Sequence, residues 1–247
     1  MLAAVVLFNF IKNSEKMKKE TTILSEDDIP STIQLEEEYR QFIVEQDHPC
    51  IMAQTVFKMG AVEVHSYKSF GTKKTARKLV TDLQKYVDNY DWESNNFVTF
   101  LAVFPTTQFE TETNFEKVLW EQLQHIHETD TNAWDKTVSS NPEDDTFSFS
   151  IAGKAFYIVG MHPNSSRMAR QTPYVTIAFN LHWQFEQLRE MGSYNVVKKR
   201  IRDRDKALQG SINPVLEDFG SNSEARQYSG RKTEKEWKCP FHHVSTT

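Results

Sequence analysis

Phe97-Val98-Thr99-Phe100-Leu101-Ala102-Val103-Phe104 is the stretch of the sequence that decides the fold. Its residues are β-branched, aromatic or aliphatic and none is charged, which is typical of a strand that is buried on both faces. Pro105 follows directly and lacks the backbone donor that a central strand needs, so the strand must end there. We therefore expect residues 97–104 to form a central strand of a sheet in the core.

Helix and strand patterns precede this stretch. Apolar residues recur at helical spacing over residues 35–43, and residues 61–67 alternate between apolar and polar side chains, as in a half-buried strand. Residues 76–87 then place their apolar side chains on one helical face. The order predicted upstream of the central strand is thus helix, strand, helix.

Further elements are predicted downstream of it. Thr113 and Glu116 have the spacing of a capping box, which predicts that a helix begins there. The remaining predicted elements are a hairpin over 147–159 that turns at Ala152-Gly153-Lys154, a strand over 174–179, and a helical region over 182–208 that is interrupted at Gly192.

This order of elements predicts an α+β fold, with a mixed sheet of about five strands packed against helices. We expect residues 1–32 to be a flexible lead-in, residues 33–241 to be a single domain and residues 242–247 to be a short tail. Helix and strand patterns fade after residue 211, but arginines, aromatic residues and a Cys-Pro pair continue to residue 241. That mixture predicts a long ordered loop rather than a disordered tail.

Composition narrows the classes of function. The chain has 29 basic and 34 acidic side chains and a net charge of −5, so no global positive field favours nucleic acid as a partner. Two cysteines in 247 residues do not make a disulfide framework. The apolar run from Met1 to Ile11 is about half the length that a membrane span needs. These features predict a cytoplasmic protein with no membrane partner.

One polar segment between two predicted strands carries most of the candidate chemistry. His162-Pro163-Asn164-Ser165-Ser166-Arg167-Met168-Ala169-Arg170 combines an imidazole with two hydroxyls and two guanidinium groups. An imidazole can ligate a metal through one nitrogen while a neighbour holds the other, and arginine forks suit carboxylates. The competing interpretation is a polar turn with exposed arginines. Within this segment the candidate binding residues are His162, Ser165, Ser166, Arg167 and Arg170.

A second polar and aromatic segment lies near the C-terminus. Residues 223–231 and 237–241 contain Arg226, Tyr228, Arg231 and Cys239, a combination that equally fits a binding loop or a loop docked through its aromatic rings. A cysteine thiolate is also a competent iron ligand, so Cys239 competes with His162 for that role. Cys50 and His48, in His48-Pro49-Cys50, are further alternatives.

Several long segments make the chain resemble the YqcI/YcgG family. The resemblance runs from about residue 40 to residue 241. It rests on Phe149-Ser150-Ile151-Ala152-Gly153, residues 160–170, Phe179-Asn180-Leu181-His182, residues 184–189, residues 201–205, residues 208–214, residues 223–231 and Trp237-Lys238-Cys239-Pro240-Phe241.

The resemblance implies a cofactor and a reaction. Members of this family from the guanitoxin and D-cycloserine pathways are haem proteins that hydroxylate a guanidino nitrogen of an arginine-like amino acid. We therefore expect haem b, with His162 as the favoured iron ligand, and a small guanidino or amino-acid substrate. An external reductase or peroxide would supply the electrons. In this hypothesis the arginines named above hold haem propionates or the substrate carboxylate, while Tyr228 and Gln209 orient the guanidino group.

Two other functions stay open from the sequence. One is a haem sensor or carrier that performs no turnover, for which an accessible haem slot and a Cys-Pro pair would suffice. The other is a structural or stress-response protein in which both polar segments only close the fold.

Overall fold

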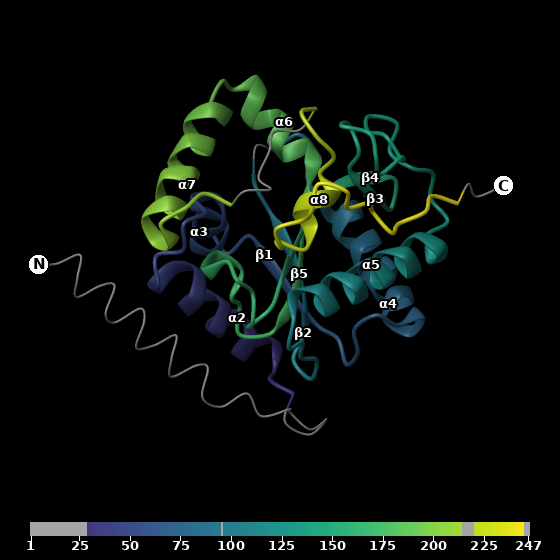
Figure 1. The fold of residues 1–247 in the computed structure, drawn as a ribbon, viewed down its shortest axis with the longest axis horizontal. Helices are drawn as coiled ribbons and strands as arrows, with labels where there is room; N and C mark the ends of the chain where they lie inside the picture. The colour runs from purple at the N-terminus through teal and green to yellow at the C-terminus, as the bar shows by residue number, and fades with distance from the viewer. Residues whose placement is uncertain (1–28, 95, 214–219, 245–247) are drawn as a thin grey trace, which may run out of the picture.

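The computed structural model describes residues 29–94, 96–213 and 220–244. It is an α+β fold in which one five-stranded mixed sheet stands between two groups of helices (Figure 1). The expected fold class is thus confirmed. The strands are β1 (Val62–Ser66), β2 (Thr99–Phe104), β3 (Phe149–Ile151), β4 (Lys154–Met161) and β5 (Val175–Leu181). The helices are α2 (Thr32–Arg40), the π-helix η2 (Gln41–Glu45), α3 (Ile51–Lys58), α4 (Lys73–Asn89), α5 (Glu112–Thr129), the 3₁₀ turn η3 (Met168–Arg170), α6 (His182–Glu190), α7 (Tyr194–Gln209) and α8 (Ala225–Tyr228).

The stretch that opened the sequence analysis forms an interior strand. The sheet order is β1-β2-β5-β4-β3, so β2 is paired on both sides, in parallel with β1 and antiparallel with β5. The strand begins at Thr99, two residues later than expected, and ends at Phe104 before the proline. Five of its six residues are buried, as its uncharged composition requires.

One face of the sheet packs against α4 and α5, which lie together on one side of the strands in Figure 1. Phe100, Ala102 and Phe104 of β2 point to this face and join a large aromatic core. The cap predicted at Thr113 is wrong. Helix α5 begins two residues earlier, where the Thr111 hydroxyl accepts a hydrogen bond from the Asn114 N–H at 3.2 Å.

The other face of the sheet is covered by α2, η2 and α3 at one end and by α6 and α7 at the other. Leu101 and Val103 of β2 point to this face, opposite to their neighbours in the strand. Helix α3 was not predicted, because an eight-residue helix between polar segments gives only a weak periodic signal. Its N-cap is Cys50, whose Sγ accepts from the Ala53 N–H at 3.5 Å.

The predicted hairpin and the break in the helical region are both present. Ala152 and Gly153 have φ of 54° and 69°, which is the pair of positive values that a two-residue type I′ turn needs. Gly192, with φ of 69°, separates α6 from α7.

The C-terminal loop is ordered where the structure describes it. Tyr228 and Phe241 are fully buried against the α4 and α5 face. Residues 1–28, which make up most of the expected lead-in, lie outside the described residues, and the division into domains stays a prediction. In the described parts of the chain, no helix combines the length and the apolar composition that a membrane span requires.

Gly160 in β4 offers a test of how tightly this sheet packs on α5. A Cβ at this position would lie 2.8 Å from Leu119 Cδ2, 2.8 Å from the Tyr228 carbonyl oxygen and 2.9 Å from Phe115 Cζ. We expect Gly160→Ala to lower the free energy of unfolding by about 1–3 kcal/mol, because the backbone of the C-terminal loop must shift. Urea denaturation followed by circular dichroism measures this change. An unchanged midpoint would show that α5 and the loop are not packed this closely.

Candidate functional site

The structure has a partly open cavity of about 330 Å³ on the face of the sheet that carries α3, α6 and α7. Strand residues Leu101, Val159 and Ala178 form its floor, because side chains on this face alternate with those that face α5. Most of the remaining wall is aliphatic or aromatic, contributed by the helices. A cavity of this kind, apolar with a few polar groups, is the usual form of a small-molecule site.

Cys50 brings a thiol to the α3 end of the cavity. The N-terminus of a helix carries partial positive charge, which favours a thiolate over a thiol. Burial raises the pKa of the Cys50 thiol, while N–H groups of α3 and the charges of Arg170 and Arg204 lower it. A group that adds positive charge here, such as a metal ion, would therefore shift the balance to the thiolate.

His48 lines the same end of the cavity but both of its ring nitrogens are used. Nδ1 accepts from the Cys50 N–H at 3.1 Å, and Nε2 lies 2.9 Å from the Ala169 carbonyl oxygen, to which it must donate. Burial lowers the pKa of His48 to about 4, so the ring stays neutral. In this arrangement His48 has no lone pair left for a metal ion and instead fixes the position of Cys50.

Both candidate binding arginines of the His162 segment line the cavity, and they differ in their partners. Arg167 forms a buried ion pair with Asp205 at 2.7 Å and also donates to Ser211. Arg170 donates to three backbone carbonyls, at 2.8 Å to Gly160, 3.3 Å to Tyr228 and 3.2 Å to Gln227. Burial lowers the pKa of Arg170, and its cation faces the cavity without a carboxylate among these partners.

An acidic group lies at the α6 end of the cavity. Glu224 is only 3% exposed, and its carboxyl group accepts from the Tyr228 hydroxyl at 3.4 Å. His182 Nε2 lies 3.8 Å from Glu224 Oε1. Burial raises the pKa of Glu224 to about 8 and lowers that of His182 to about 4. At neutral pH both side chains are therefore mostly uncharged.

His162 lies on the opposite face of the sheet from the cavity. Met161 lines the cavity, and the alternation of the strand carries Gly160 and His162 towards α5. The imidazole is fully buried, with its centroid 4.5 Å from that of Phe115, and neither ring nitrogen has a hydrogen-bond partner among the described residues. This placement does not support His162 as a ligand for a group held in the cavity.

Cys239 and Tyr228 also belong to the α5 face. Cys239 lies in the aromatic core, where burial raises the pKa of its thiol to about 12. The Tyr228 ring stacks on Trp120, and its hydroxyl accepts from the Phe149 N–H at 3.0 Å. Neither residue is among those that line the cavity. Packing in the aromatic core accounts for Cys239, whereas the Tyr228 hydroxyl also donates to Glu224, which lines the cavity.

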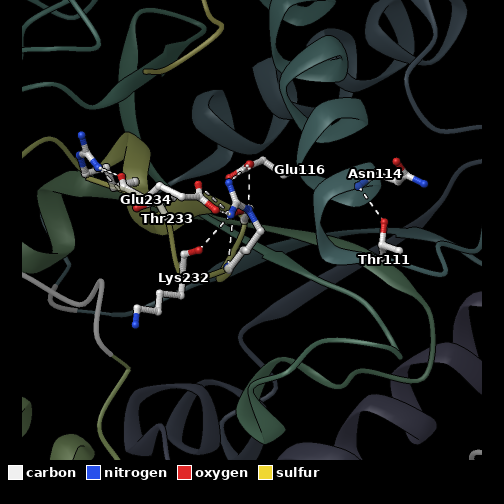
Figure 2. A network of polar contacts seen from close by, with 9 residues as sticks. Thr111, Asn114, Glu116, Lys232, Thr233 and Glu234 are labelled. Carbon is white, nitrogen blue, oxygen red and sulfur yellow. Dashed lines mark hydrogen bonds and ion pairs between the residues drawn. The ribbon is translucent and has the colours of Figure 1, made fainter. Parts of the chain in front are cut away.

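The two arginines of the C-terminal segment hold the loop in place. Arg231 pairs with Glu116 of α5 at 2.7 Å and with Glu234 at 2.9 Å, in the network that Figure 2 shows between α5 and residues 232–234. Arg226 donates to the Trp237 carbonyl at 2.9 Å and lies over the Trp237 ring. These contacts are structural, and neither arginine lines the cavity.

Ser165, Ser166 and Gln209 close the polar loop after His162. Glu112 accepts from the Ser166 N–H at 2.8 Å and from the Ser166 hydroxyl at 2.9 Å, and it also receives the Ser165 hydroxyl at 3.4 Å. Gln209 donates to the Ser166 carbonyl at 2.7 Å and accepts from the Met168 N–H at 2.8 Å. Gln209 thus ties the loop to α7 and does not reach the cavity.

Glu224, His182 and Tyr157 all line the cavity and were not predicted from the sequence. Two of them carry a recognisable signal. Glu224 is the acidic residue of an otherwise basic and aromatic segment, and His182 stands where a buried strand passes directly into a helix. Tyr157 alternates with core residues in β4 and gives no separate signal.

The fold and this site define an α+β protein with a partly open, largely apolar cavity between helices and one face of a mixed sheet. The family model described as YqcI/YcgG family matches residues 39–242, and the chain belongs to this family. A curated relative, "Uncharacterized protein YqcI" of Bacillus subtilis (strain 168), is 25% identical over 208 residues, which cover 80% of this chain and 81% of the relative. No solved structure gives a significant match.

The Arg231 network provides a test of how strongly the C-terminal loop is held. Arg231 is largely buried, so Glu116→Gln leaves its cation without its buried partner, and we expect a loss of about 3–5 kcal/mol in the free energy of unfolding. Glu234→Gln is the matched control, because Glu234 is an exposed partner of the same arginine, and we expect almost no loss of stability. Equal effects of both changes in urea denaturation would contradict this assignment.

His162 predicts a pH dependence of stability. Burial lowers its pKa from 6.5 to about 4, so the unfolded chain binds a proton more readily than the folded chain. The free energy of unfolding therefore falls as the pH drops below 6.5, by about 2 kcal/mol from this residue between pH 7.5 and 5.

Denaturation of His162→Leu at both pH values tests this dependence. Since the imidazole makes no hydrogen bond among the described residues, leucine should preserve stability at pH 7.5 and reduce the acid loss. His242→Gln, which changes an exposed histidine, is the control. An acid loss as large in His162→Leu as in the wild type would refute the prediction.

Proposed function

We propose that this protein is a haem-dependent oxygenase that hydroxylates a guanidino or amine nitrogen of a small amino-acid-like substrate. The observation that carries the proposal is the Cys50 thiol, which stands at the N-terminus of α3 and faces an apolar cavity. Of the metal ligands considered from the sequence, His162 and Cys239 point to the other face and His48 has both nitrogens engaged. Cys50 is therefore the ligand that we assign to the iron.

The lining of the cavity has the chemistry that a haem requires. The macrocycle needs an apolar slot, which the strand floor and the helices supply. Its two propionates need cations, and Arg170, Arg189, Lys198 and Arg202 all line the cavity. Arg170 is the best placed of these for an anion, because its partners are carbonyl groups.

Protein groups around Cys50 support a thiolate. The N–H of Ala53 donates to Sγ, and the positive charges of Arg170 and Arg204 favour the ionised form. His48 receives the Cys50 N–H and holds the start of α3 against Ala169. A bound haem would supply activation of dioxygen or peroxide, and a thiolate ligand favours that chemistry by donating electron density. Electrons would come from an external reductase or from peroxide itself.

The absorption spectrum of the protein purified from haem-supplemented cells tests this proposal. We expect a Soret band, with the red-shifted ferrous–carbon monoxide spectrum that marks a thiolate ligand, and we expect Cys50→Ala to lose that signature. Cys239→Ala is the matched control for a buried cysteine, and His162→Leu tests the ligand favoured from the sequence; both should keep the wild-type spectrum. A folded protein with no Soret band would refute the haem proposal. Loss of the band in His162→Leu, with retention in Cys50→Ala, would return the ligand role to the histidine.

Incubation of the haem-loaded protein with arginine and either peroxide or a reductase tests turnover. The expected product carries one additional oxygen atom on a guanidino nitrogen, which mass spectrometry with isotopically labelled oxygen detects. A haem-loaded protein that forms no such product from arginine or related amines would instead be a haem sensor or carrier.

A further inference from the structure

We propose that Glu224 is the counter-ion for the cationic group of a ligand in this cavity, and that an ammonium or guanidinium group displaces its proton on binding. The inference rests on the proposed function in one respect, since it takes the same cavity as the substrate site. It goes further by naming the side chain that selects a cation.

The carboxyl group of Glu224 is placed where a ligand can reach it. Glu224 immediately precedes α8, lines the cavity and is 3% exposed, so its charge is shielded from solvent but open to a ligand. Its carboxyl contacts are the hydroxyl of Tyr228 at 3.4 Å, the hydroxyl of Ser148 and the imidazole of His182 at 3.8 Å. The two hydroxyls are neutral, and His182 is neutral at the pH of the cell because burial lowers its pKa to about 4.

The other acidic residue of the cavity already has a cation as its partner. Asp205 and Glu224 are the two acidic side chains among the described residues that line the cavity. Asp205 is already paired with Arg167 at 2.7 Å and accepts from the Asn213 N–H at 3.1 Å. Glu224 is therefore the acidic side chain of the cavity with which a cationic ligand can form an ion pair.

The cost of burial keeps the proton on Glu224. A buried carboxylate whose direct contacts are neutral is costly, and the charge of Arg189 lowers the pKa by less than burial raises it, so the group keeps its proton until a cation arrives. Burial raises the pKa of Glu224 to about 8, which leaves roughly nine-tenths of the groups protonated at pH 7. A cation bound against the carboxylate lowers that pKa, and the proton leaves to the solvent.

The charged and titratable groups around Glu224 set the pH range of this exchange. They are His182, Glu186 and Arg189 of α6, Tyr228 of α8 and Tyr157 of β4. The pKa values of both tyrosines are raised above 10, so neither of them titrates near pH 7. His182 stays neutral above its lowered pKa of about 4. Arg189 lowers the pKa of Glu224, and the exposed Glu186 raises it.

Isothermal titration calorimetry with the full chain tests the inference directly. The probes are L-arginine and L-citrulline, which have nearly the same shape but differ in the charge of the end group. Titrations at pH 7 in phosphate and in Tris, whose ionisation enthalpies differ, give the number of protons exchanged. We expect arginine to release about one proton, and citrulline to bind at least about tenfold more weakly and to release none.

Glu224→Gln and Glu186→Gln form a matched pair of variants. Glu224→Gln keeps the shape of the side chain and should abolish proton release, weaken arginine at least about tenfold and remove the preference over citrulline. Glu186→Gln removes a half-exposed carboxylate that acts on Glu224 only through its charge, so this variant should keep most of the proton release and the preference for arginine over citrulline. Circular dichroism checks that each variant is folded.

Three results would overturn the inference. They are arginine binding without proton release, the same proton release in Glu224→Gln as in the wild type, and no binding of arginine, agmatine or lysine at millimolar concentration. These results differ from those that would refute the proposed function, which are the absence of a Soret band or of a hydroxylated product. Cation binding with proton release in a protein that takes up no haem would leave the role of Glu224 intact.

Discussion

The alternation of side chains along β4 is the constraint on which the rest of the structure depends. Tyr157, Val159 and Met161 face the cavity, while the residues between them face α5 and the C-terminal loop. A shift of the register by one residue would exchange the two sets and destroy both the aromatic core and the cavity. The pairing of β4 with β5 over six residues fixes that register. One side of the sheet therefore holds the aromatic core, and the other side carries the cavity.

Buried arginines connect the two sides across the end of the sheet. Arg231 ties the C-terminal loop to α5 through Glu116, and Arg167 ties the polar loop to α7 through Asp205. Arg170 bridges them, because it binds the carbonyl of Gly160 in β4 and those of residues 227 and 228 in the C-terminal loop. A substitution in the C-terminal loop can thus change the position of Arg170 in the cavity, although the substituted residue does not line the cavity. Buried charges of this kind add little net stability, but removal of one partner is strongly destabilising.

Much of the fold follows from the sequence, while most of the site does not. Residues 97–104, the hairpin turn at Gly153 and the break at Gly192 carry local signals, and each is present in the structure. The placement of His162 depends instead on which face of the sheet its side chain points to and on which face holds the cavity. The spacing of residues in the sequence reveals neither. Glu224 and Cys50 are 174 positions apart in the sequence and meet the same cavity only through the sheet. Their roles could not be derived from local pattern.

The N-cap of α3 favours a functional explanation for Cys50. Serine, threonine, aspartate and asparagine are the strong capping residues, because their oxygen accepts a short hydrogen bond from the first turn. Here a thiol takes that place, and its sulfur accepts from the Ala53 N–H at 3.5 Å. Sulfur is a weak acceptor, so the helix gives up part of the stability that serine would provide. Positions that break a local rule without a compensating contact are most often functional. The same replacement puts a soft, ionisable side chain at the positive end of a helix and in an apolar cavity.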